Sequence, residues 1–116
     1  MAKHNKLAKE GELIAFMILQ RDGFTILETN WRFQKAEIDI IARKDGLLIF
    51  TEVKTRGSKK FEKPSDAINK NKIALYKDAV VGYLEQYPSE DEIRFDLVNI
   101  IIGKDETQIE HIPNAF

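Results

Sequence analysis

The first 20 residues place apolar side chains at the spacing of a helix face. Phe16 and Met17 extend this apolar surface nearly all round, so we expect the helix to pack on more than one side. The dipeptide Asp22-Gly23 is typical of a helix end. We therefore predict a helix over residues 1–20, whose inward face is Leu7, Gly11, Ile14, Ala15, Ile18 and Leu19.

Three β-rich segments follow, at residues 24–32, 37–43 and 47–54. Asp45-Gly46, between the last two, is typical of a two-residue hairpin turn. That turn places Asp39 opposite Glu52 and Glu37 opposite Lys54 on one face of the sheet. The other face would carry Ile38, Ile40, Ile49 and Val53.

The second half of the chain predicts a helix and two further strands. A polar, basic loop at 55–63 leads to Pro64-Ser65-Asp66, where Ser65 is a candidate N-cap, and Pro88 marks the helix end. Strands at 94–102 and 108–112 close the order α-β-β-β-α-β-β. A helix between the third and fourth strands permits a parallel pair. The predicted fold is α/β, a mixed central sheet flanked by helices. The inward stripe of the second helix would be Ile68, Leu75, Ala79, Gly82 and Tyr83.

The opposed carboxylates Asp39 and Glu52 are the strongest chemical signal. Like charges directly opposite each other destabilise a sheet, and a divalent cation between them would turn repulsion into coordination. The alternative is a solvent-facing charged stripe, in which Glu37 and Lys54 form a plain cross-strand ion pair. Leu48 and Phe50 on the same face speak against a fully solvated stripe.

Length and composition narrow the class of protein. The 116 residues suit a single domain over 1–116, and the absence of cysteine excludes disulfide scaffolds and thiolate metal sites. No apolar run approaches the ~20 residues of a membrane span, and no secretory leader is recognisable. We therefore expect a soluble cytoplasmic protein without a membrane partner.

Charge is distributed unevenly along the chain, although the net charge is only −1. Residues 54–77 hold eight basic residues against the two acids Glu62 and Asp66. Such a segment can present a cationic face to a polyanion. The alternative, a solvated lysine-rich loop and helix, stays open. The eight are Lys54, Arg56, Lys59, Lys60, Lys63, Lys70, Lys72 and Lys77.

These residues resemble a known group of enzymes. Asp39 followed by Glu52-Val53-Lys54 is similar to the PD-(D/E)xK signature of restriction-endonuclease-like and Holliday-junction-resolvase folds. The whole chain resembles the small bacterial YraN-like family, except that Ala36 stands where that family usually has glycine. The resemblance rests on Gly11-Glu12, Asn30-Trp31-Arg32, Ala36-Glu37-Ile38-Asp39, Glu52-Val53-Lys54-Thr55-Arg56, Arg94-Phe95-Asp96 and Ile112-Pro113-Asn114-Ala115-Phe116.

The resemblance implies a restriction-endonuclease-like fold and roles for particular residues. Asp39 and Glu52 would bind Mg²⁺ or Mn²⁺, and Lys54 would orient or deprotonate the attacking water. Glu12, at the border of the apolar stripe of the first helix, would complete the site. Its alternative is a border glutamate that reaches solvent.

Several other residues are weaker candidates. Arg56 and Lys72 are candidate phosphate contacts, with a free loop arginine and a lysine that reaches solvent as the alternatives. Glu37 would hold Lys54. Asp96, on an apolar strand, is expected to form structural hydrogen bonds, and His111 is given no role. The tyrosines of the second helix are expected in the core or at its rim: Tyr76, Tyr83 and Tyr87.

The function predicted from the sequence is metal-dependent hydrolysis of DNA phosphodiesters, with structured or branched DNA as one substrate and RNA still open. Lys59, Lys60 and Lys63 would contact the backbone together with Arg56 and Lys72, without base specificity. Two alternatives remain: a noncatalytic nucleic-acid-binding module, and a small partner subunit that assembles through its hydrophobic helix. A homodimer also stays open.

Overall fold

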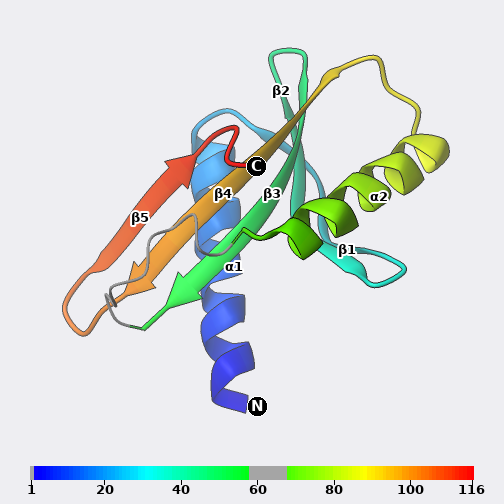
Figure 1. The fold of residues 1–116 in the computed structure, drawn as a ribbon. Coiled ribbons are helices and arrows are strands. Elements are labelled where there is room, and N and C mark those ends of the chain that lie inside the picture. Colours follow the sequence, from blue (N-terminus) through cyan, green and yellow to red (C-terminus); the bar gives the residue numbers. More distant parts are fainter. Residues whose placement is uncertain (1, 58–67) are drawn as a thin grey trace.

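The computed structural model of the protein describes residues 2–57 and 68–116, which form three layers with a sheet between two helices (Figure 1). Helix α1 (Ala2–Arg21) lies behind the sheet in this view, and helix α2 (Lys70–Gln86) lies in front of it. Within the described residues, no helix combines the length and apolar content that crossing a bilayer requires. The observed order, α-β-β-β-α-β-β, is the predicted one.

The five strands follow the order of the sequence across the sheet. They are β1 (Thr25–Phe33), β2 (Ala36–Lys44), β3 (Leu47–Arg56), β4 (Glu92–Ile102) and β5 (Thr107–Ile112). All neighbours are antiparallel except β3 and β4, which form the predicted parallel pair. Lys44 pairs with Leu47, as the Asp45-Gly46 turn predicts, and Asp45 and Gly46 both have positive φ.

The predicted alternation along β2 is wrong at one point. Ile38 packs in the core on the α2 side of the sheet, whereas Ile40 packs in the core on the α1 side. Residues two apart on a regular strand share a face, so β2 changes sides at Asp39. On the neighbouring strand Thr29 pairs with Ile40 and Trp31 with Ile38, and Asn30 between them has φ +52°. A kink across both strands therefore falls at Asp39.

Helix α1 ends as predicted and packs on fewer sides than predicted. Gly23, at φ +93°, follows its last turn, and the Phe24 N–H donates to the Leu19 carbonyl. Ala15 and Leu19 are buried against the sheet. Leu13 and Met17 are 60% and 56% exposed, so one apolar face of the helix is uncovered. Gly11 lies against Thr55 of β3, and a Cβ there would overlap the Thr55 side chain.

Helix α2 begins later than predicted. Its N-cap is Asn69, whose side-chain oxygen accepts the Lys72 N–H at 2.8 Å. Ser65, the predicted cap, lies outside the described residues, and Ile68 precedes the helix. Asparagine satisfies the free N–H groups of a first turn as well as serine does, and Asn69 is the one that does so here. The buried residues of the helix are Tyr76, Ala79, Val80, Gly82 and Tyr83.

Candidate active site

Two buried carboxylates meet where β2 and β3 separate. Asp39 is 9% exposed and Glu52 is 8% exposed. The β2–β3 pairing ends at Ile40 and Thr51, one position before these residues would face each other. Beyond it, the Val53 N–H donates to Asp39 Oδ2 at 2.7 Å. A side-chain carboxylate thus accepts a β3 N–H where regular pairing would supply a backbone carbonyl.

Two side chains of helix α2 bind the Glu52 carboxylate. The Tyr76 hydroxyl donates to Glu52 Oε1 at 2.6 Å, and Lys72 Nζ pairs with Glu52 Oε2 at 2.8 Å. Lys72 and Tyr76 are one helical turn apart, so both point toward the same strand. Tyr76 is 1% exposed and stacks on Phe116, with ring centroids 5.0 Å apart. Glu52 is therefore fixed by two donors from a rigid element.

The electrostatics of the pair disfavour two negative charges. Burial, and then the charge of Glu52, raise the pKa of Asp39 to about 8, although the Val53 hydrogen bond opposes the rise. Burial and the Glu52 charge also raise the pKa of Tyr76, so its hydroxyl stays protonated and donates. Near neutral pH the metal-free pair carries one proton more than two free carboxylates would.

Helix α1 brings a third carboxylate to the same place. Glu12, Asp39 and Glu52 all line a cavity of about 300 Å³, together with Lys72 and Tyr76. Burial, and then the charge of Glu37, raise the pKa of Glu12, while a hydrogen bond from the Asn30 side chain lowers it. The predicted convergence of Glu12, Asp39 and Glu52 on one cavity is present.

Lys54 lines a hollow beside this cavity rather than the cavity itself. It is half-buried, and the hollow, of about 140 Å³, is also lined by Glu52, Val53 and, on α1, Leu7 and Ala8. Glu37 forms an ion pair with Arg32 Nε at 3.4 Å instead of the predicted pair with Lys54. The kink at Asp39 explains the error, because it ends the β2–β3 register before Glu37 can face Lys54.

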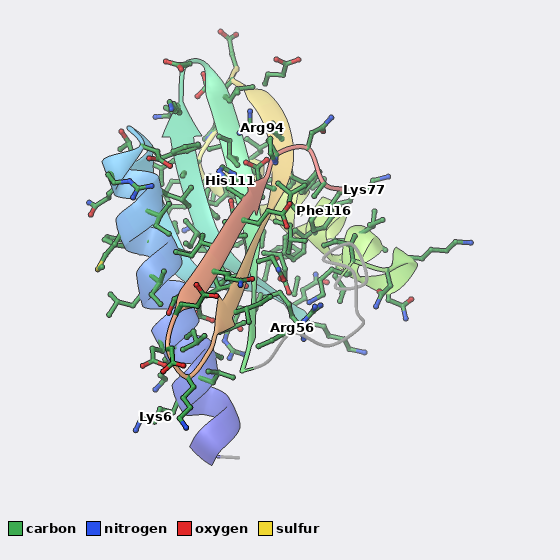
Figure 2. The ribbon with its side chains drawn as sticks, turned by 90° about the vertical axis from the view of Figure 1, so that its left-hand side faces the viewer. Lys6, Arg56, Lys77, Arg94, His111 and Phe116 are labelled. Atoms are coloured by element: carbon green, nitrogen blue, oxygen red, sulfur yellow. The ribbon has the colours of Figure 1, made fainter. Side chains whose placement is uncertain are left out.

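The candidate phosphate contacts lie in different settings. Arg56 is the last residue of β3, the central strand, and is 9% exposed; it is labelled in Figure 2. Lys72 is engaged with Glu52 rather than solvated. Lys59, Lys60 and Lys63 lie outside the described residues. The phosphate contacts of all five stay predictions.

Two further polar residues had no predicted partner. Tyr76 was expected in the core or at its rim and lies in the core, but its hydrogen bond to Glu52 has no sequence signal other than helical spacing. His111, which was given no role, lies 2.7 Å from Asp96, whose carboxylate also binds Arg94 Nε and Nη2 and the Asn114 N–H. The structural hydrogen bonds predicted for Asp96 are confirmed, and Arg94 and His111 lie close together in Figure 2.

The donor set at the cavity suits a hard divalent cation. Such ions take carboxylate oxygens, and a cation bound here would favour the charged form of Asp39, which burial and then the Glu52 charge disfavour. In the described part of the chain, no three acidic, histidine or cysteine side chains come close enough together to hold an ion. Asp39 and Glu52 are thus the candidate protein ligands, and Glu12 would have to move toward them to become the third.

Comparisons with known proteins place the chain among small bacterial relatives. It is 47% identical to a UPF0102 protein of Flavobacterium psychrophilum and 45% identical to one of Christiangramia forsetii, each over all of this chain and 98% of the relative. A UPF0102 protein of Syntrophomonas wolfei is 38% identical over 97% of this chain and 99% of its own length. Residues 11–100, which include Glu12, Asp39 and Glu52, match the family itself. The chain therefore belongs to the uncharacterised protein family UPF0102.

Proposed function

We propose that this protein is a metal-dependent endonuclease that hydrolyses DNA phosphodiester bonds on a restriction-endonuclease-like fold. The observation that carries the proposal is the buried pair of Asp39 and Glu52 at a break in the sheet. Burial, and then the charge of Glu52, raise the pKa of Asp39 to about 8, so the two charged carboxylates are unfavourable together in the metal-free protein. A bound cation would remove this unfavourable interaction, which is why the pair suits a metal site.

Each residue of the site has a distinct part in this reaction. Asp39 and Glu52 would hold Mg²⁺ or Mn²⁺, which when bound supplies an activated water and charge stabilisation for phosphodiester hydrolysis. Val53 and Tyr76 fix the orientation of the two carboxylates through hydrogen bonds. Glu12 would complete the acidic wall from α1.

A lysine is needed near the scissile phosphate, and two are candidates. Lys54 belongs to the Glu-x-Lys pattern but lines the neighbouring hollow, whereas Lys72 lines the carboxylate cavity itself. A cation bound by Glu52 would repel the Lys72 ammonium and release it from its ion pair. Lys72 would then be free to contact a phosphate oxygen. Loss of cleavage in Lys54→Ala would assign the phosphate contact to Lys54, and loss of cleavage in Lys72→Met would assign it to Lys72.

The pairing of Lys72 with Glu52 also favours a second candidate function. A lysine that permanently neutralises Glu52 leaves a weaker cation site, as in a noncatalytic nucleic-acid-binding module. In that case Lys72→Met would increase metal affinity without producing cleavage. If the protein is an enzyme in which Lys72 contacts the phosphate, Lys72→Met reduces turnover instead; if Lys54 has that role, Lys54→Ala does.

The test is cleavage of linear and branched DNA in Mn²⁺ and in EDTA. The purified protein is compared with Asp39→Ala, Glu52→Ala, Lys54→Ala and Lys72→Met, with Asp78→Ala as a control that removes an exposed carboxylate of α2. We expect cleavage in Mn²⁺ only, loss of cleavage in the first two variants, and normal cleavage in Asp78→Ala. Equal cleavage by the wild type and by Asp39→Ala and Glu52→Ala would reject the enzyme.

Contact with the DNA backbone is tested by salt dependence. The logarithm of the affinity falls with the logarithm of salt concentration by about 0.9 for each duplex phosphate contact. Replacing Lys59, Lys60 and Lys63 together should flatten this slope by up to roughly 3. An unchanged slope would show that these lysines do not contact phosphate.

A further inference from the structure

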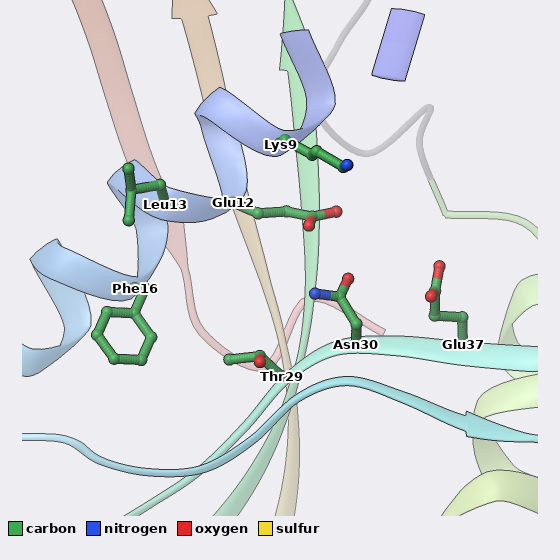
Figure 3. A pocket seen from close by; sticks show the side chains of 7 residues that line it. All are labelled: Lys9, Glu12, Leu13, Phe16, Thr29, Asn30 and Glu37. Atoms are coloured by element: carbon green, nitrogen blue, oxygen red, sulfur yellow. The ribbon is translucent and has the colours of Figure 1, made fainter. Parts of the chain in front are cut away.

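A second, larger cavity adjoins the acidic one and is not used by the proposed chemistry. It measures about 560 Å³ and lies between α1 and the first two strands (Figure 3). Glu12 and Glu37 line both cavities, so the two adjoin each other at these side chains. We call the larger one the α1 groove; its lining residues are Lys9, Glu12, Leu13, Phe16, Thr29, Asn30 and Glu37.

The α1 groove has one apolar end and one polar end. Figure 3 shows Leu13, Phe16 and Thr29 together at one end, and the charged ends of Lys9, Glu12 and Glu37 at the other. Leu13 is 60% exposed and Phe16 is half-buried, so an aliphatic chain and an aromatic ring are open to a ligand. Asn30 lies at the polar end, where its amide is hydrogen-bonded to the Glu12 carboxylate.

From this arrangement we propose that the α1 groove binds one unpaired nucleobase of the nucleic-acid strand whose backbone passes the carboxylate cavity. This inference rests on the proposed function, and it assigns a substrate class to the same site: DNA with an unpaired nucleotide beside the scissile phosphate.

The charges of the groove select the base rather than the phosphate. Glu12 and Glu37 outnumber Lys9, so a second phosphate would be repelled. A base is uncharged and planar, and it gains from stacking on a ring while its edge binds amide and hydroxyl groups. The volume of about 560 Å³ falls within the range of ligand pockets, roughly 300–1,000 Å³.

The same geometry selects an unpaired base. A base inside a duplex has both faces covered by its neighbours, so it cannot stack on Phe16 without leaving the helix. Single strands, flaps and branch points present such bases without that cost. The groove therefore favours these substrates over intact duplex.

The experiment measures binding in EDTA, where no cleavage occurs. The probes are a short DNA single strand with a dye at one end, the same strand with one abasic position, and a version with 2-aminopurine at that position. The variants are Leu13→Ser, which removes an apolar contact, and Phe16→Leu, which removes the ring and keeps an apolar side chain. Met17→Ser is the matched control, because Met17 is exposed on the same helix at 56% and does not line the groove.

We expect the wild type to bind the intact strand about 5-fold to 150-fold more tightly than the abasic strand, the range of one base–aromatic stack. Binding should quench the 2-aminopurine. Leu13→Ser and Phe16→Leu should reduce both the preference and the quenching, and Met17→Ser should behave as the wild type.

Three results would overturn the proposal. Equal affinity for the intact and abasic strands would show that the groove binds no base. An unchanged preference for the intact strand in Phe16→Leu would show that the base does not stack on Phe16. Equal weakening by Leu13→Ser and Met17→Ser, with a change in sedimentation, would make this helix face an interface between two copies. Cleavage in Mn²⁺ is measured separately from binding. Base-dependent binding without cleavage would reject the proposed enzyme and support base binding in the α1 groove. Cleavage without base-dependent binding would reject only the role of the α1 groove.

Discussion

Replacing Asp39 by asparagine should change how the stability of the metal-free protein depends on pH. Asparagine keeps the shape and can still accept the Val53 N–H, but it cannot ionise. The pKa of Asp39 is about 8 in the folded protein against the ordinary value of 3.8. Between these values the folded state binds one proton that the unfolded state has released, so stability falls as pH rises.

One proton bound on folding corresponds to a slope of about 1.4 kcal/mol for each pH unit. We expect the free energy of unfolding of the wild type to fall by about this amount per pH unit, relative to Asp39→Asn, between pH ~5 and ~7. Comparing the two proteins cancels the titration of the groups that do not interact with Asp39. Above pH ~8 the difference should stop growing, because Asp39 is then charged in both states.

The assay is urea unfolding in EDTA at several pH values, followed by circular dichroism. Asp78→Asn is the control, since its carboxylate is exposed on α2 and its removal should leave the slope unchanged. Parallel curves for the wild type and Asp39→Asn across this range would refute the reasoning, because they would show that Asp39 is already ionised in the folded protein.

Three further predictions concern the site and its support. Millimolar Mn²⁺ should stabilise the wild type by about 2.7 kcal/mol at 100 times its Kd and Asp39→Asn by much less, and equal gains in thermal melts would argue against a metal site. Asp96→Ala should lower the free energy of unfolding by about 3 kcal/mol, since it leaves Arg94 unpaired beside a buried position. Burial alone would raise the pKa of Asp96, but its hydrogen bonds outweigh this and lower it, so the stabilisation should be lost as pH falls below about 4, which acid titration measures. Gly11→Ala should cost about 1–3 kcal/mol by overlap with Thr55, and Thr55→Ala in the same chain should recover part of that loss in denaturant unfolding.

The fold was predictable from the sequence where neighbouring residues alone determine the backbone conformation. Asp45-Gly46 adopts the positive φ values of its turn, and this alone fixes the pairing of β2 with β3 near the turn. The prediction fails at Asp39, where β2 changes faces opposite the positive φ of Asn30 on the neighbouring strand. Alternation of residue types along one strand cannot show such a change of face.

The sequence also could not predict which side chains on different helices and strands would bind each other. Helical spacing placed Tyr76 in the core, but spacing gives a face and not an acceptor, so its hydrogen bond to Glu52 was not foreseeable. The same holds for Lys72, which was expected at a phosphate or in solvent. His111 reaches Asp96 only because β5 pairs with β4, a contact that no local pattern encodes.

The hydrogen bond from Val53 to Asp39 gives the protein a built-in spectroscopic reporter. The amide proton of Val53 points at the carboxylate, so its NMR chemical shift depends on whether that oxygen carries a proton, a free charge or a coordinated cation. Ionisation and cation binding at the side chain of Asp39 can thus be followed at a backbone position fourteen residues further along the chain. A single isotope-labelled amide would record occupancy of the cavity without any substrate or change to the sequence.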